Sequence, residues 1–194
     1  MRKFAIRPTL TLKGRTFNGL RGLSGKPLHP PLTDFPIAAY VLAAFFDLIS
    51  AIAGIDHAWA RELWHAGTFT FIGGAAVSIL AALSGLADAV KKSEAGTQVR
   101  RTINTHATIM ITVTVLALAD LTWRLKEYHT ATVTPIGILV LSVIIAMLVS
   151  LGAMFGGSLV FEHGFNVETA GEDQAWHKSE TDVFPGEQGK NFSV

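Results

Sequence analysis

The residues of this chain that could take part in chemistry are ionisable residues within long apolar runs. Asp47 lies in the first apolar run, and Asp120 and His106 lie in the third. A charged group in the hydrocarbon layer costs about 2.5–3.5 kcal/mol on insertion scales, so such groups are rare unless they have a function. These residues are therefore candidates for cofactor ligation or proton transfer.

The seven histidines form two groups, according to the side of the apolar runs on which they lie. His29, His106 and His163 share one side, and His177 could join them from the tail. The other side holds His57, His65 and His129, of which the first and last are interpreted as ordinary loop residues. A b-type haem in a membrane bundle requires two imidazoles from different helices at one depth. We predict haem iron ligation by His106 with His163 or His29. The alternative is a structural hydrogen-bond cluster with backbone carbonyls.

Charged and rigid residues adjoin this predicted haem site. Arg21, Arg100 or Arg101 could bind the haem propionates at the membrane surface. The segment Pro30–Pro31 lacks backbone N–H donors and favours extended chain. We therefore expect His29 to lie outside a regular helix, close to the mouth of the bundle.

A second polar group is predicted towards the opposite side, from Asp47, Asp120 and His65. Helical spacing places Asp120 on the same inward face as the histidine of the third run. The three residues could serve the proton side of quinone chemistry. Alternatively, the two aspartates pair with His65, Arg61 or Arg124 and stabilise that end of the protein.

Four apolar runs must position these side chains. They are Pro36–Ile55, Gly67–Ala87, Ile103–Leu121 and Pro135–Phe161. Each is long enough to cross a hydrocarbon core of about 30 Å at about 1.5 Å per residue. Because the connections are short, the sequence predicts an all-α integral membrane protein, an antiparallel four-transmembrane-helix bundle over residues 27–165.

Lys and Arg are distributed unequally between the two sides. Residues 1–26 contain seven of them and the loop of residues 91–101 contains four, against three on the opposite side. The positive-inside rule therefore predicts that the basic extension of residues 1–26 and the acidic tail of residues 166–194 are both cytoplasmic. We interpret the extension as a membrane-anchoring segment and the tail as a solubilising one, rather than as nucleic-acid-binding regions.

The composition excludes several kinds of site. The chain has no Cys, so it cannot form disulfides, thiolate metal sites, iron–sulfur clusters or covalently attached haem from its own residues. The sequence also has no nucleophile–base arrangement, phosphate-binding loop or metal-hydrolase motif. Hydrolytic and group-transfer chemistry are therefore not expected.

Two segments at the ends of the apolar region have distinctive sequences, namely Gly25–Pro36, which reads GKPLHPPLTDFP, and Gly156–Val167, which reads GGSLVFEHGFNV. Both resemble the end segments of a known family, the bacterial four-span membrane family called domain-of-unknown-function family 2231. Between them, Leu83–Asp88 and Asn104–His106 also resemble family positions. The resemblance covers roughly residues 24–168. It implies a multi-pass protein of the prokaryotic plasma membrane with histidines at matching ends of its spans.

The resemblance also implies a theme of electron transfer, because some family members are fused to a Rieske-type iron–sulfur domain. Without Cys, this chain would need an iron–sulfur partner as a separate subunit. Three function classes follow. The first is a redox subunit with haem b that exchanges electrons with a quinone or a partner protein. The second is a structural or assembly subunit of a larger membrane complex. The third is a proton or solute pathway that uses Asp47 and Asp120, for which four spans leave little room.

Overall fold

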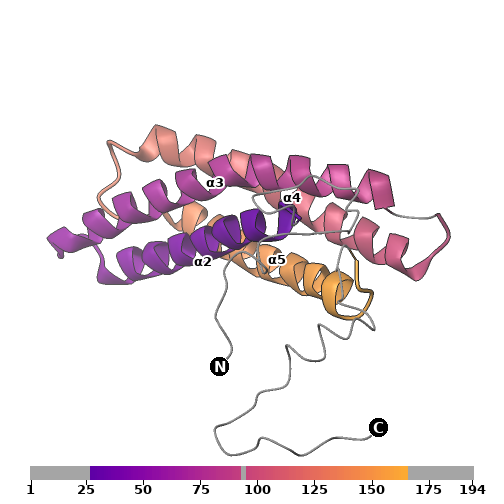
Figure 1. Cartoon of the computed structure of the whole chain (residues 1–194). Helices are drawn as coiled ribbons and strands as arrows, with labels where there is room; N and C mark the ends of the chain where they lie inside the picture. Colours follow the sequence, from indigo (N-terminus) through magenta and orange to yellow (C-terminus); the bar gives the residue numbers. More distant parts are fainter. Residues whose placement is uncertain (1–26, 93–94, 166–194) are drawn as a thin grey trace, which may run out of the picture.

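The computed structural model describes residues 27–92 and 95–165, and four long helices make up nearly all of this part (Figure 1). The helices are α2 (His29–Ala53), α3 (Ala58–Lys92), α4 (Gln98–Glu127) and α5 (Ile136–Phe161). All four are long and apolar enough to cross a membrane. The predicted all-α, antiparallel four-helix bundle is therefore confirmed. The basic extension, the acidic tail, Arg21 and His177 lie outside the described residues.

The four helices surround a common interior in which α2 and α4 are diagonally opposed. Helix α2 packs against α3 and α5, and α4 packs against α5 and, least extensively, against α3. Side chains from α2 and α4 can therefore meet only across the interior of the bundle. Both polar clusters described below use this diagonal.

Helix α2 begins earlier than the apolar pattern indicates. Its first residue is His29, the two following prolines occupy its first turn, and Pro36 lies inside the helix. The expectation that His29 lies outside a regular helix is wrong. The first N–H groups of a helix have no intrahelical partner, so a proline in the first turn removes nothing and its fixed φ favours the helix.

Helices α3 and α4 also extend beyond their apolar runs. Helix α4 begins after Thr97, whose hydroxyl accepts a hydrogen bond from the Arg100 N–H at 3.2 Å. This capping bond satisfies one of the free N–H groups at the start of the helix. The extra turns place Arg100 and Arg101 on the helix that carries His106, and they place Trp64 inside α3.

The distribution of apolar side chains is that of a membrane protein. Small and medium residues pack inside around Tyr40 and Phe71, while large apolar residues cover the outside. The exposed set includes Leu83, Leu86, Ile111, Val115, Met147 and Met154. Gly74 lets α2 and α3 approach closely, because a Cβ there would stand 2.8 Å from the Cβ of Ala39. Close contact through small residues is how helices associate in lipid.

Candidate functional site

Polar side chains gather at the two opposite ends of the bundle interior. The histidine end contains His29, His106 and His163, and the arginine end contains Asp47, Asp120 and Arg124. His106 and Arg124 both lie on α4, separated by five turns of one helical face. The inward orientation predicted for Asp120 is observed, since Asp120 is buried together with Val113 and Ala117 on the same helix.

At the histidine end, the ring of His29 lies against α3. Its Nδ1 stands 2.9 Å from the carbonyl oxygen of Ala81 and 3.3 Å from the hydroxyl of Ser84. The ring packs directly on Gly85, where a Cβ would stand 2.6 Å from the His29 Cε1. A carbonyl oxygen can only accept, so Nδ1 carries the proton and the neutral ring has its free lone pair on Nε2.

The ring of His106 is held in the same manner on the other side of the interior. Its Nδ1 stands 2.8 Å from the carbonyl oxygen of Gly152 on α5. Its Cε1 faces Gly156, where an added Cβ would stand 3.3 Å away. In its neutral form, the ring of His106 therefore also has its free lone pair on Nε2.

The two imidazoles meet across the α2–α4 diagonal. Their ring centroids are 6.4 Å apart, and their planes are nearly perpendicular at 83°. Two imidazoles on opposite sides of one metal ion would have centroids roughly 6 Å apart, given metal–nitrogen bonds of about 2.0–2.1 Å. Within residues 27–92 and 95–165, no three His, Asp or Glu side chains could hold a metal ion together. The two imidazoles are thus the candidate ligands at the histidine end.

The other predicted ligands lie nearer the helix ends. His163 follows α5, and its Nε2 stands 3.4 Å from the hydroxyl of Thr102, one turn before His106. Arg100 and Arg101 lie in the first turn of α4, roughly 8 Å from His106 along the helix axis. Arg101 is exposed and hydrogen-bonds Gln98 at 2.7 Å. The structure thus brings His29, rather than His163, beside His106.

Asp88 adds a buried carboxyl on the α3 face that receives His29. It lies one turn beyond Ser84 and is almost fully buried. Its Oδ1 has no hydrogen-bond partner. A carboxyl at this position could pair with Lys91 or Lys92, three and four residues further along the helix. The two lysine side chains lie outside what the structure describes.

Substituting Gly85 by Ala is expected to displace His29 and to destabilise the bundle by about 1–3 kcal/mol, the usual cost of overpacking. Gly73→Ala is the matched control on the same helix, because its Cβ would meet only Phe35 at an ordinary 3.7 Å. The control should gain up to about 1 kcal/mol from helix propensity. Thermal unfolding in detergent measures both variants. Equal midpoints for the two would show that the His29 ring does not depend on Gly85.

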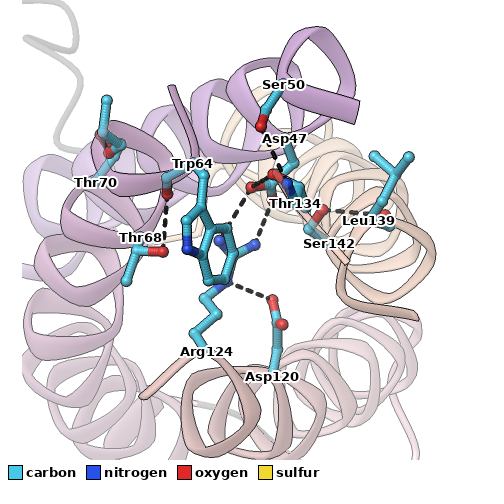
Figure 2. Close-up of polar contacts among 11 residues, drawn as sticks. Asp47, Ser50, Trp64, Thr68, Thr70, Asp120, Arg124, Thr134, Leu139 and Ser142 are labelled. Atoms are coloured by element: carbon cyan, nitrogen blue, oxygen red, sulfur yellow. Dashed lines mark hydrogen bonds and ion pairs between the residues drawn. The ribbon is translucent and has the colours of Figure 1, made fainter. Parts of the chain in front are cut away.

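At the arginine end, Arg124 makes a two-pronged contact with Asp47 across the diagonal (Figure 2). Its Nη1 donates to Asp47 Oδ1 at 3.1 Å, and its Nη2 donates to Oδ2. Its guanidinium also lies over the rings of Phe71 and Trp64, at 4.6 and 5.4 Å from their centroids. Both charged side chains are fully buried. Arg124 is one of the three partners that the sequence left open for Asp47.

Further hydrogen bonds join three segments of the chain at this end. The hydroxyl of Thr134 donates to Asp47 Oδ1 at 3.3 Å, and its N–H donates to the hydroxyl of Ser50 at 3.1 Å. Ser50 in turn donates to the carbonyl oxygen of Ala60 at 2.7 Å. Figure 2 shows Asp47, Ser50 and Thr134 close together at this junction. The arginine end is therefore a fixed polar junction.

Asp120 accepts fewer hydrogen bonds than Asp47 at this junction. Its Oδ2 accepts from Arg124 Nε at 3.1 Å, whereas its Oδ1 has no hydrogen-bond partner. His65, which we expected to reach one of the aspartates, stacks instead on Tyr128 with centroids 4.5 Å apart. Trp64 occupies the interior in its place. Adjacent helical residues point about 100° apart, so His65 and Trp64 face different neighbours.

The protein is an integral membrane protein. It is a small bundle of four membrane-spanning helices with buried polar groups at both ends. The family model described as predicted membrane protein (DUF2231) matches residues 25–169, and the chain belongs to this family. The predicted resemblance is confirmed. The chain matches no curated protein and no solved structure.

Proposed function

We propose that this protein is a membrane redox subunit that binds one b-type haem through His29 and His106. It would exchange electrons with a quinone or with a partner protein. The observation that carries this proposal is the pair of imidazoles 6.4 Å apart across the bundle diagonal, each with Nδ1 on a carbonyl of a neighbouring helix. Metal-ligating histidines commonly donate their second ring N–H to a carbonyl, which orients the ring and makes it a better ligand.

The surroundings of the two rings favour a flat cofactor. Gly85 and Gly156 present no side chain to either ring. Helices α3 and α4 pack against each other least extensively, so their seam is where the bundle can widen most easily. Arg100 and Arg101, in the first turn of α4, are suited to bind propionates at the membrane surface.

Haem bound in this way would supply one-electron transfer between its ferric and ferrous states. The protein's own part is to orient both imidazoles, to surround the cofactor with apolar helices and to compensate the propionate charges. His163 is assigned no ligand role, because its Nε2 lies beside Thr102 rather than beside His106. By the positive-inside rule, the histidine end would face the cytoplasm of a prokaryotic cell.

A structural or assembly subunit is the second candidate, and the same hydrogen bonds favour it. The His29–Ala81 bond links α2 to α3, and the His106–Gly152 bond links α4 to α5. Rings held only to connect helices would need no metal. A solute pathway is less well supported, because both oxygens of Asp47 are already occupied by Arg124 and Thr134.

Titration of the purified full chain with ferric haem separates the first two candidates. A redox subunit should saturate at one haem per chain, with the absorption spectrum of a six-coordinate low-spin iron. His57→Ala should bind equally well, because His57 lies exposed in the loop between α2 and α3, where its Nδ1 stands 2.8 Å from the carbonyl oxygen of Ala53. Absorbance that rises without saturation at one equivalent would refute haem binding and favour the structural subunit.

A further inference from the structure

We propose that Asp120 is a proton-binding site, held as a neutral carboxylic acid beside the ionised pair of Asp47 and Arg124. This site lies about 21 Å from His106 along α4, at 1.5 Å per residue. It is independent of haem binding. Its evidence is the burial, the hydrogen bonds and the charge count of the arginine end.

The formal charges of Asp47, Asp120 and Arg124 do not balance, so the cluster needs one more positive charge. Asp47, Asp120 and Arg124 are each 0 % exposed. With both carboxyls ionised, the cluster would carry one uncompensated negative charge in the membrane interior. An unpaired buried charge is far more costly than a neutral buried group, so such groups neutralise instead.

No other side chain supplies that charge within the described residues. The groups that α2, α3, α5 and the segment before α5 present to the cluster are uncharged, namely Ser50, Trp64, Thr68, Thr134 and Ser142. Ionisable residues close in sequence are exposed or turned away, namely Arg61, Glu62, His65, Lys126 and Glu127. We therefore assign the missing charge to a proton, the smallest ion that could supply it.

The hydrogen bonds show which carboxyl takes the proton. Asp47 accepts three hydrogen bonds, which stabilise its ionised form. Asp120 accepts only one, from Arg124 Nε, and its Oδ1 has no partner. A proton on Oδ1 leaves the bond from Arg124 to Oδ2 intact. A metal cation would find this one free carboxylate oxygen, too few ligands for a hard cation that prefers six or more.

Loss of this proton would change how strongly each of the two carboxyl groups attracts Arg124. An ionised Asp120 would attract the guanidinium that now contacts Asp47, and that contact joins α2 to α4. The proton on Asp120 thus stabilises the α2–α4 link. The site can take up or release one proton within the membrane, at the opposite end from the histidines.

Infrared spectroscopy of the full chain in lipid tests this assignment, because a protonated carboxyl has a C=O band distinct from that of a carboxylate. We expect such a band at neutral pH that disappears in alkaline buffer. Asp120→Asn should delete it, Asp120→Glu should shift it, and Asp34→Asn, at an exposed position, should leave it unchanged.

Two outcomes would overturn the proposal. One is a wild-type spectrum at neutral pH without a protonated carboxyl band. The other is a band that persists unchanged in Asp120→Asn. If that variant does not fold, the shift in Asp120→Glu and the wild-type alkaline titration still decide the question. None of these readings depends on haem, so they can fail while the haem proposal stands.

Discussion

Replacing Arg124 with Met is expected to destabilise the bundle by about 3–5 kcal/mol, the cost of breaking a buried ion pair by removing one partner. Arg124 is fully buried, and its substitution would leave the Asp47 carboxylate without a counter-charge in the interior. The variant should unfold at a much lower temperature in detergent, as measured by loss of helical circular dichroism.

Two matched variants isolate the cause of that loss. Arg124→Met with Asp47→Asn removes both charges, so it should recover much of the stability that the single variant loses. Lys126→Met removes an exposed positive charge two residues away from Arg124, and this variant should behave like wild type. If Arg124→Met alone melted like wild type, the ion pair would not be what stabilises this end.

Replacing His106 or His29 with Ala is expected to abolish haem binding, because a haem held by two protein ligands loses one of them in either variant. Both rings lie on the diagonal with their Nε2 lone pairs free. His163→Ala should retain the haem, since that ring lies beside Thr102. Haem content per chain, measured after purification with haem supplied, gives the result.

The pattern across the three variants identifies the ligands. Loss in His106→Ala and His163→Ala but not in His29→Ala would show that the wrong pair is assigned here. Full haem content in all three variants would show that no histidine at this end binds the haem iron. Each variant's helical content must match wild type, because the His29 and His106 rings also bond neighbouring helices.

The fold could be predicted from sequence because each span is specified by its own apolar run. The start of α4 is also indicated by the sequence, because Thr97 is a capping residue type, whereas no such residue marks the polar turns that extend α3 beyond its apolar run. The start of α2 was missed for a different reason. Prolines were interpreted as helix breakers, although in a first turn they favour the helix.

The partners within each polar cluster were only partly predictable. Spacing on α4 correctly placed His106 and Asp120 on one inward face. The residue of another helix that contacts them depends on how each helix is rotated about its axis. Sequence spacing within one segment does not determine the rotation of another segment. That is why His29 could not be separated from His163. It is also why Trp64, beside His65 in sequence, was not recognised as the residue facing Arg124.

The most direct test of the haem proposal is a reduced-minus-oxidised absorption spectrum of the full chain, purified in detergent after expression with haem supply. A b-type α-band, at one haem per chain, is the predicted result and would establish an electron carrier. A folded helical protein with no such band would contradict it. The His29 and His106 rings would then be helix-connecting residues of a structural membrane subunit.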